Sequence, residues 1–310
     1  MTGRHDKLLL LDTASLYFRA YYGVPDSLTA PDGTPVNAVR GLLDFVARLV
    51  TDGRPTRLVA CLDEDWRPAF RVAAVPSYKA HRVAPETTDG SEDVPDTLAP
   101  QVPVIMEVLD ALGIARAGAP GFEADDVIGT LTARADVPVD VVTGDRDLFQ
   151  LVDDARKVRV LYTARGVGKH EVVDDAVVRE KYGVPGRSYA DLAVLRGDPS
   201  DGLPGVKGVG EKTAAQLIRQ YGDLAALIAA LDAGDPALPA AAGRKLAAAR
   251  DYLDVAPPVV RVALDVPLPE LEDRLPTEPR DPDKLVALAD RWGLDGPVGR
   301  VLAAFKVAAG

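Results

Sequence analysis

Four short apolar runs in the first half of the chain alternate with stretches that have helical periodicity. Each run is bounded by polar or turn residues, which is typical of buried strands. The predicted strands are 7–11, 58–62, 137–142 and 158–162. The predicted helices among them are 36–50, 102–112 and 123–133. This alternation predicts an α/β fold with a mainly parallel central sheet and helices on both faces.

The second half of the chain changes to helical patterns, several of them rich in alanine. Alanine is a strong helix former, so these segments favour a helical bundle. The predicted helices are 174–182, 189–196, 211–221, 224–231, 243–253, 284–292 and 301–307. We therefore expect an α/β core over 1–170, a helical region over 171–260, and a tail over 261–310 that packs on the core.

The segment 82–100 interrupts the α/β rhythm, because it is rich in Pro, Asp, Glu, Thr and Gly and poor in apolar residues. Such composition is typical of a disordered surface loop. A long loop in a compact domain is also often a functional lid. The sequence leaves both interpretations open.

The composition limits which cellular compartment and which binding partners are expected. No apolar run approaches the roughly 20 residues of a membrane span, and the N-terminus has too short an apolar stretch for a signal peptide. The single Cys61 excludes an internal disulfide framework and suits a reducing cytoplasm. The histidines His5, His81 and His170 are scattered, so no zinc site is expected. A net charge of −11 argues against a partner as acidic as DNA, unless bound cations offset part of it.

Nine carboxylates stand near the ends of predicted strands or the starts of predicted helices. They are Asp12, Asp63, Glu123, Asp125, Asp126, Asp145, Asp147, Asp198 and Asp201. The carboxyl ends of parallel strands share one sheet edge, so these acids would repel one another unless a cation neutralised them. With little His or Cys available, that cation is a hard divalent ion such as Mg²⁺ or Mn²⁺. Any one of these acids could simply cap a helix or form a turn, but the whole set predicts two ions about 4 Å apart that act on a phosphodiester.

The glycine-rich segment 202–218 predicts a second functional element. Glycines at 205, 208 and 210 allow a tight turn before the helix at 211–221, where backbone amides can bind an anion. Lys207 and Lys212 add positive charge. With the helix 189–196 this makes a helix–hairpin–helix, which grips a DNA phosphate backbone without reading bases. It is not a Walker A loop, because no Gly-Lys-Ser/Thr stands at the required spacing.

A basic stretch at 70–82 follows the second strand. Its members are Arg71, Tyr78, Lys79, His81 and Arg82. Cations with an interleaved aromatic ring suit a single nucleic-acid strand, through phosphate contact and base stacking. The alternative is that these side chains are merely solvated.

Together these segments resemble the 5′-nuclease family, the 5′→3′ exonucleases and flap endonucleases that include the N-terminal nuclease domain of bacterial DNA polymerase I. The resemblance covers about residues 7–222 in family order. The matching pieces are LLLLDTASLYFRAYYGVP, PDGTPVNAVRGLLDF, LDEDWRPAFR, PSYKAHR, GFEADDVIGTLT, VVTGDRDLFQLV and LRGDPSDGLPGVKGVGEKTA. The most specific are GFEADD and the last piece.

The resemblance implies a PIN-like nuclease core, an arch segment at about 78–100 and a helix–three-turn–helix that binds duplex DNA. It implies two metal sites, or three, holding Mg²⁺ or Mn²⁺. One would use Asp12, Asp63, Glu123, Asp125 and Asp126, and the other Asp145, Asp147, Asp198 and Asp201. Lys79 and Arg82 match basic residues at the arch base that contact the scissile phosphate, and Arg71 matches a further catalytic position. The implied DNA-binding residues are Arg19, Tyr78, Gly205, Lys207, Gly208, Gly210 and Lys212, with K⁺ held at the hairpin.

The implied activity is that of a stand-alone, monomeric 5′ nuclease that removes primers and flaps in DNA replication and repair. Its partners would be DNA with 5′ ends or 5′ flaps and RNA in RNA–DNA primers, with no membrane. Two departures from the family pattern are the acidic arch at 83–99 and Arg40, where relatives often have Tyr. A non-catalytic DNA-binding protein is a rival hypothesis, disfavoured because all nine acids are present. A PIN-class ribonuclease is another, disfavoured because such domains are usually shorter and lack the hairpin.

Overall fold

The computed structural model describes residues 6–85 and 91–309. Within them, a six-stranded sheet has the order β3-β2-β1-β4-β5-β6. Neighbouring strands are parallel except for β6, which runs antiparallel to β5. The strands are β1 Leu8–Asp12, β2 Arg57–Cys61, β3 Ala115–Ala117, β4 Val139–Thr143, β5 Val158–Tyr162 and β6 Glu171–Val173. The expected mainly parallel sheet is confirmed, with four strands within two residues of their predicted bounds.

Strands β3 and β6 were not predicted. Each has only three residues, which is too short to show a period-2 pattern. The central strands β1 and β4 are buried along their whole length, which explains their continuous apolar runs.

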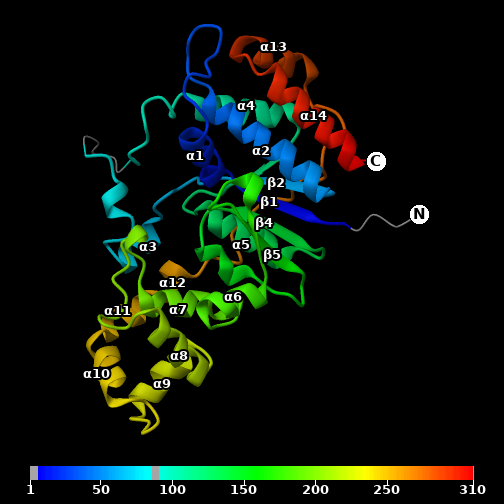
Figure 1. Cartoon of the computed structure of the whole chain (residues 1–310). Helices are drawn as coiled ribbons and strands as arrows, with labels where there is room; N and C mark the ends of the chain where they lie inside the picture. Colours follow the sequence, from blue (N-terminus) through cyan, green and yellow to red (C-terminus); the bar gives the residue numbers. More distant parts are fainter. Residues whose placement is uncertain (1–5, 86–90, 310) are drawn as a thin grey trace.

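Helices cover both faces of the sheet, as expected (Figure 1). On one face α2 packs against α1, α4 and α14, and on the other α5 packs against β1 and β2. The helices of the core are α1 Thr13–Gly23, α2 Asn37–Gly53, α3 Ala69–Ala74, α4 Gln101–Leu112 and α5 Ala124–Arg134. Short 3₁₀ turns are η1 Ala80–Arg82, η2 Asp147–Leu151, η3 Val167–Lys169, η4 Gly186–Ser188 and η5 Pro199–Asp201. Among the described residues no helix has the length and apolar character that a membrane span requires.

The helical region lies beyond β6 at one end of the molecule (Figure 1). Its helices are α6 Asp175–Tyr182, α7 Tyr189–Arg196, α8 Glu211–Tyr221, α9 Leu224–Asp232, α10 Ala240–Ala248, α11 Arg250–Val255 and α12 Pro257–Val260. It has its own apolar core, which includes Leu192, Leu217 and Leu227. The helix predicted at 243–253 is two helices, because the chain breaks at Ala249.

The tail returns to the core through α13 Pro282–Trp292 and α14 Asp295–Ala309. Leu288, Val301 and Phe305 join the same apolar cluster as Leu42 of α2 and Leu109 of α4. Helix α14 begins six residues before the predicted segment, because Gly296 and Pro297 gave a weak helical signal there.

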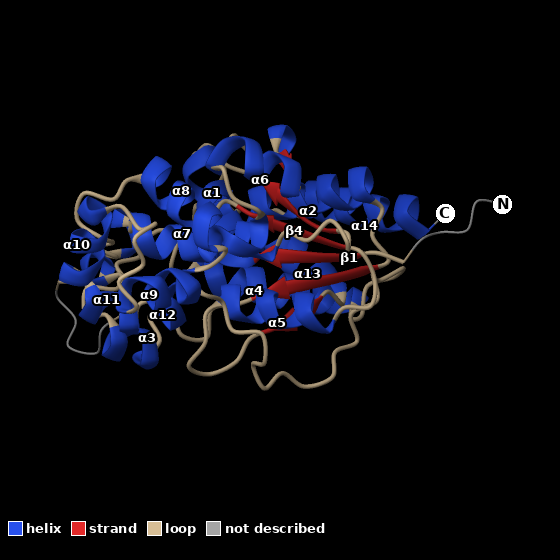
Figure 2. Ribbon diagram, turned by 90° about the horizontal axis from the view of Figure 1, so that it is seen from below, coloured by secondary structure: helices blue, strands red, loops and turns tan. Residues whose placement is uncertain are grey.

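The strand arrows point toward the side where α3 and α9 to α12 lie (Figure 2). The carboxyl ends of the strands therefore face the helical region and the chain that follows β2. Within that chain Val83 bridges to Glu92 and α4 begins at Gln101. Residues 86–90, part of the segment for which disorder was one interpretation, lie outside the described residues.

Candidate active site

Three strands deliver an aspartate each to one edge of the sheet. Asp12 is the last residue of β1, Asp63 lies two residues after the end of β2, and Asp145 two residues after the end of β4. The parallel register sets Asp12 beside Cys61 and Leu11 beside Val142. The three carboxylates therefore meet at the same edge, as the strand pattern predicted.

A cavity of about 230 Å³ opens at this edge. Its carboxylates are Asp12, Asp63, Glu92, Glu123, Asp125 and Asp145, and its cations are Lys79 and Arg82. All of them except Glu92 were predicted from the sequence as site residues. Glu92, Ser15 and Trp66 also line the cavity and were missed, because no local pattern links them to a strand end.

Asp12 is held in place by hydrogen bonds at the floor of the crevice. Its Oδ2 accepts from Thr143 Oγ1 at 2.6 Å and its Oδ1 from the Ser15 amide at 3.2 Å, as the N-cap of α1. Burial, followed by the charge of Asp63, raises the pKa of Asp12 to about 7. A cation bound nearby would stabilise the ionised form of this carboxylate.

Asp63 and Asp125 lie beside Asp12 without a cation of their own. Asp63 Oδ1 accepts from the Ala124 amide at 2.8 Å, which fixes it at the start of α5. Desolvation by the surrounding protein raises the pKa of Asp63, although part of its side chain is exposed to solvent in the crevice. The pKa of Asp125 is raised well above its ordinary value by burial and then by Asp12 and Asp145. These carboxylates repel one another through the crevice.

Asp147, Asp198 and Asp201 form a second group that adjoins the first through Asp145. The Asp147 amide donates to Asp145 Oδ1 at 2.9 Å. Burial, then the charges of Asp145, Asp201 and Asp198, raises the pKa of Asp147 well above its ordinary value. Asp198 accepts from the Ser200 amide at 2.9 Å and lies 3.6 Å from the Arg196 guanidinium. The structure thus brings the second predicted group together at the end of β4 and the turn after α7.

Lys79 and Tyr78 contact Glu123 rather than solvent. Lys79 Nζ lies 2.5 Å from Glu123 Oε2, and Tyr78 Oη donates to Glu123 Oε1 at 2.7 Å. The Tyr78 side chain is only 3% exposed, so its ring has no free face for a base. The predicted stacking role of Tyr78 is therefore replaced by a structural one.

Arg71 and Asp126 form a buried pair behind the cavity. Arg71 Nη1 and Nη2 donate to the two Asp126 oxygens at 2.8 and 2.7 Å, and Asp126 Oδ1 also accepts from the Ala263 amide at 2.8 Å. Arg71 is 2% exposed. The expected metal ligation by Asp126 and phosphate contact by Arg71 both disagree with this geometry, because the two buried groups bind each other and their remaining bonds go to the backbone at Ala263 and Val259.

The base of the arch docks on the turn that carries Asp201. Arg82 Nη2 donates to Asp201 Oδ1 at 2.8 Å, and the Lys79 amide donates to the Asp201 carbonyl at 2.9 Å. Ser77 Oγ donates to the Gly202 carbonyl at 2.7 Å, and a Cβ on Gly202 would lie 2.0 Å from the Ser77 carbonyl oxygen. Gly202 therefore allows two segments more than 100 residues apart to meet at the crevice.

The chemistry of these donors fits hard divalent ions. In the described residues no three His, Cys, Asp or Glu side chains are arranged to hold one ion by themselves. Mg²⁺ keeps most of its waters and takes only one or two carboxylates, so spaced carboxylates with raised pKa values match its needs. Cations of the protein contact Glu123, Asp126 and Asp201 closely and Asp198 more distantly, and Asp12, Asp63, Asp125, Asp145 and Asp147 fit added ions.

The hairpin between α7 and α8 exposes Lys207, Gly208, Gly210 and Lys212. Gly210 is the N-cap of α8 and brings no side-chain acceptor to the helix amides, which leaves them open to an anion. Gly205 is buried instead, and a Cβ there would lie 2.5 Å from the Gly197 amide nitrogen. Its predicted DNA contact is thus replaced by a close backbone approach within the hairpin.

Lys245 is a hairpin cation that the sequence did not reveal. Its Nζ donates to the Gly208 carbonyl at 2.7 Å from α10, 37 residues along the chain. This carbonyl already has a cationic partner, which weakens the expectation of K⁺ at that oxygen. No short motif could reveal a contact over this separation.

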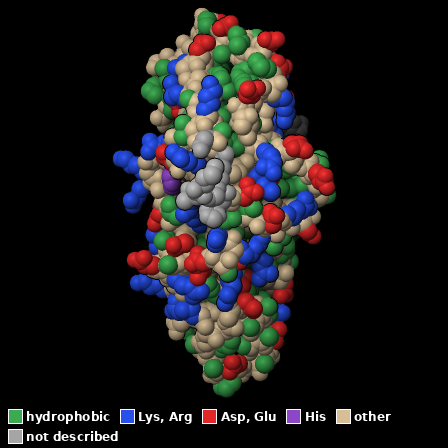
Figure 3. Space-filling view, turned by 90° about the vertical axis from the view of Figure 1, so that its right-hand side faces the viewer, with side chains coloured by type: hydrophobic (Ala, Val, Ile, Leu, Met, Phe, Trp, Pro, Cys, Tyr) green, Lys and Arg blue, Asp and Glu red, His purple; other side chains and the backbone are tan. Residues whose placement is uncertain are grey.

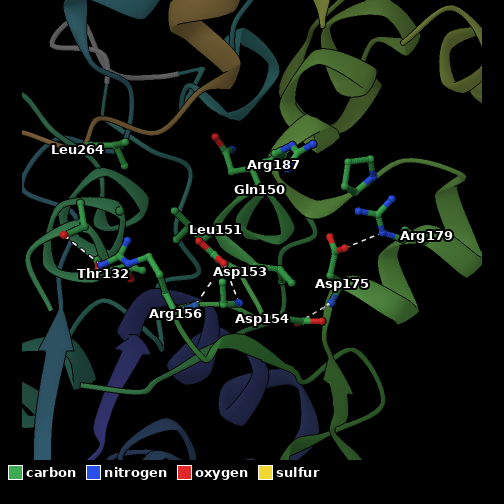
Figure 4. A pocket seen from close by; sticks show the side chains of 15 residues that line it. Thr132, Gln150, Leu151, Asp153, Asp154, Arg156, Asp175, Arg179, Arg187 and Leu264 are labelled. Carbon is green, nitrogen blue, oxygen red and sulfur yellow. Dashed lines mark hydrogen bonds and ion pairs between the residues drawn. The ribbon is translucent and has the colours of Figure 1, made fainter. Parts of the chain in front are cut away.

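A second cavity, of about 340 Å³, shares no lining residue with the crevice (Figure 4). It is bordered by the end of α5, the turn at 153–156 and η4. Several of its charged groups already have partners: Arg179 Nε donates to Asp175 at 2.6 Å, and Asp153 accepts from the backbone amides of Ala155 and Arg156. It contains none of the nine acids and is not the candidate site.

On the side where both termini lie, basic and acidic side chains are intermingled (Figure 3). Part of the net charge of −11 belongs to the carboxylates of the crevice itself.

Comparison with known proteins decides the family. Residues 7–183 match the model of the 5′-3′ exonuclease N-terminal resolvase-like domain, and residues 184–283 match that of the 5′-3′ exonuclease C-terminal SAM fold. The chain belongs to the 5′-3′ exonuclease family. It is 67% identical to a 5′-3′ exonuclease of Streptomyces coelicolor, over 95% of this chain and 98% of that protein. It is 54% identical to one of Mycobacterium tuberculosis, over 95% and 96%.

A longer relative shares only this part. The chain is 42% identical to DNA polymerase I of Mycobacterium bovis over 91% of its own length and 30% of the polymerase. Among solved structures, the T5 D15 protein co-crystallized with metal ions has a TM-score of 0.61 at 17% identity, over 97% of this chain and 99% of that one. Human GEN1 in complex with Holliday junction DNA also has a TM-score of 0.61, at 16% identity, over 98% and 71%. These likenesses confirm the fold of this family.

Proposed function

We propose that this member of the 5′-3′ exonuclease family hydrolyses phosphodiester bonds of DNA at 5′ ends and at 5′ flaps. The observation that carries the proposal is the crevice in which Asp12, Asp63, Asp125 and Asp145 converge without a protein cation of their own. A carboxylate cluster of this kind suits divalent ions that neutralise it. The relatives named 5′-3′ exonuclease support the same chemistry.

The cofactors that fit are two Mg²⁺ or Mn²⁺ ions. Asp12, Asp63 and Asp125, with Glu123 at their side, would hold one, and Asp145, Asp147 and Asp198 the other, with Asp201 at their side on Arg82. When bound, such ions lower the pKa of a water and stabilise charge on the attacked and leaving oxygens. A third ion and a K⁺ at the hairpin belong to the same proposal, with Lys245 as a competitor for the K⁺.

Lys79 and Arg82 bind the scissile phosphate in this proposal. Both line the crevice, and both are positioned by acids: Lys79 by Glu123 and Arg82 by Asp201. A phosphate bound in the crevice would contact two cations that are already in position, and these would stabilise the negative charge of the transition state for its hydrolysis. Arg71 acts through others, because it holds Asp126 and lies 3.2 Å from Glu123 Oε1.

The hairpin holds the duplex by its backbone. Lys207, Lys212, Lys245 and the amides at the start of α8 offer positive charge on one exposed surface. Such contacts read no bases, so the shape of the DNA selects the substrate. Because the bases are not read, RNA in RNA–DNA primers would also bind. The protein would act as a monomer in primer and flap removal during replication and repair.

Cleavage of a DNA flap labelled at its 5′ end tests the proposal. With Mn²⁺ or Mg²⁺ we expect short products from the flap and no cleavage in excess chelator. Asp145→Ala removes the carboxylate at which the two groups adjoin and should abolish cleavage while retaining the far-UV circular dichroism of the wild type. Faster cleavage of an equivalent RNA flap would favour a ribonuclease, and binding without cleavage under all metals would favour a non-catalytic DNA-binding protein.

A further inference from the structure

A strap of backbone, residues 259–263, leads from the end of α12 into the tail. Its valines pack into two different apolar cores: Val260 into that of the helical region, and Val262 into the one between α5 and the sheet. Gly129 of α5 allows the strap to approach closely, because a Cβ there would lie 2.7 Å from the Ala263 carbonyl oxygen. Both parts of the molecule therefore set the position of the strap.

Gln150 joins the strap to the second group of acids. Its Nε2 donates to the Val260 carbonyl at 3.0 Å and to the Asp147 carbonyl at 2.8 Å. Its Oε1 accepts from the Val262 amide at 3.1 Å. Because a side-chain amide has two N–H donors and both are used here, Gln150 cannot rotate without losing bonds. It therefore fixes the backbone of η2 to the strap.

The same 3₁₀ turn carries Asp147, whose amide donates to Asp145 Oδ1 at 2.9 Å. A continuous chain of hydrogen bonds thus runs from the strap through Gln150 and Asp147 to Asp145. Both acids belong to the proposed second ion site. Metal ligands are oriented by the hydrogen bonds behind them, and loss of such a partner typically lowers metal affinity or activity about 10–100-fold.

The strap also reaches the first group, through Arg71. Arg71 Nε donates to the Val259 carbonyl at 3.0 Å, and its Nη1 lies 3.2 Å from Glu123 Oε1. This link is made of buried charges, so its loss would destabilise the fold itself. Gln150 is neutral, and its three bonds all go to backbone groups. It is therefore the link between strap and acids whose removal leaves no buried charge.

We propose that Gln150 is a positioning residue, which orients Asp147 for the second ion by holding η2 on the strap. Gln150 itself contacts neither the substrate nor the ion. This role rests on the proposed nuclease function. It makes the second ion site depend on the strap and leaves the first ion site independent of Gln150.

Binding of Mn²⁺ to the protein without DNA tests the positioning role. Isothermal titration calorimetry of the wild type should resolve two ions. In Gln150→Met the side chain keeps its length but makes none of the three bonds. We expect the dissociation constant of one ion to rise about tenfold, the lower end for loss of a group behind a metal ligand, and that of the other to stay within about twofold.

Cleavage of a 5′ flap gives an independent readout. Gln150→Met should need about tenfold more Mn²⁺ for its half-maximal rate, because the weakened ion must be bound before hydrolysis. The KM for the flap at saturating Mn²⁺ should stay within about twofold of wild type, because Gln150 does not touch the DNA.

Gln101 offers a matched control. It likewise joins separate backbone segments: its Oε1 accepts from the Ala38 amide at 2.9 Å, and its Nε2 donates to the Thr97 carbonyl at 2.8 Å. It does not line the crevice. Gln101→Met should lower the melting temperature, as Gln150→Met does, but leave both Mn²⁺ dissociation constants unchanged. A glutamine with a merely structural role would behave in this way.

Gly129→Ala moves the strap without altering Gln150. Its methyl group would press on the Ala263 carbonyl, so we expect Mn²⁺ binding to weaken in the same direction. Gly299→Ala adds the same methyl group to α14, where nothing lies within 4 Å, and should leave Mn²⁺ binding unchanged. This pair tests the strap even if Gln150→Met does not fold.

The outcomes separate the two proposals. If the wild type neither binds Mn²⁺ nor cleaves the flap, the nuclease function is wrong. If the wild type does both, and Gln150→Met binds Mn²⁺ as tightly as Gln101→Met, the positioning role is wrong while the nuclease function stands. If Gln150→Met does not fold, equal Mn²⁺ binding by Gly129→Ala and Gly299→Ala would overturn the positioning role.

Discussion

Eight of the nine predicted acids, all except Asp198, lie in two regions that differ in whether a protein cation pairs with the carboxylate. The arch-base region contains Glu123, Asp126 and Asp201, and each is paired with Lys79, Arg71 or Arg82 at 2.5 to 2.8 Å. The strand-end region contains Asp12, Asp63, Asp125, Asp145 and Asp147. In the described residues no Lys or Arg forms an ion pair with any of these five.

This difference separates the acids that stabilise the fold through ion pairs from the acids that can bind an added cation. Removing one partner from a buried ion pair leaves an uncompensated charge, whereas neutralising one of several crowded acids relieves repulsion. Asp125 and Asp126 are neighbours in the sequence but belong to different regions. Substitutions in the two regions should therefore have opposite effects on stability.

The largest expected effect is in the arch-base region. Arg71→Met leaves Asp126 buried without its partner and should destabilise the protein by about 3–5 kcal/mol. The midpoint of urea unfolding, measured with excess chelator, checks this. Adding Asp126→Asn to Arg71→Met should recover part of the loss, because the buried charge is gone. An unchanged midpoint for Arg71→Met would show that the pair does not stabilise the fold.

In the strand-end region the effect should be on activity. Asp125→Asn should lower kcat/KM on a flap at least about a hundredfold, as expected when charge stabilisation in the transition state is lost. Its melting temperature in chelator should equal or exceed that of wild type, because one repelling charge is removed. A loss of stability like that of Arg71→Met would erase the distinction between the two regions.

Divalent ions should stabilise the wild type through the same region. At one hundred times its dissociation constant a ligand that binds only the folded state adds about 2.7 kcal/mol. We expect Mn²⁺ to raise the melting temperature of wild type and to raise that of Asp125→Asn much less. Titrating Mn²⁺ in a thermal-shift measurement checks this, with K⁺ at equal ionic strength as the control.

The smallest expected effect concerns pH. The folded pKa of Asp12, about 7, lies above its ordinary value of 3.8, so between these values the folded state binds more protons than the unfolded state. Without metal, Asp12 should therefore lower stability as pH rises from about 4 to about 7. Asp12→Asn should remove at least about 1 kcal/mol of this decline. This is less than the free energy that corresponds to a shift of one pKa unit, about 1.4 kcal/mol. Urea midpoints at pH 5 and pH 8 in chelator give the comparison, and equal slopes for both proteins would contradict it.

Local patterns in the sequence were sufficient for the order of the main strands and helices. The runs at 58–62 and 158–162 and the helix at 211–221 needed only apolar periodicity and flanking glycines. The three-residue strands β3 and β6 were missed because they depend on pairing with β2 and β5 rather than on their own residues. The same limit applies to Glu92 and Lys245, which come to their sites from distant segments.

The sequence by itself determined that acids stand at the strand ends and that parallel strands bring them to one edge. Only the tertiary structure decided which of them are already paired. Arg71 reaches Asp126 across 55 residues and Arg82 reaches Asp201 across 119 residues. The physical reason is that strand and helix formation depend on neighbours along the chain, whereas burial and charge pairing depend on segments that meet only after packing.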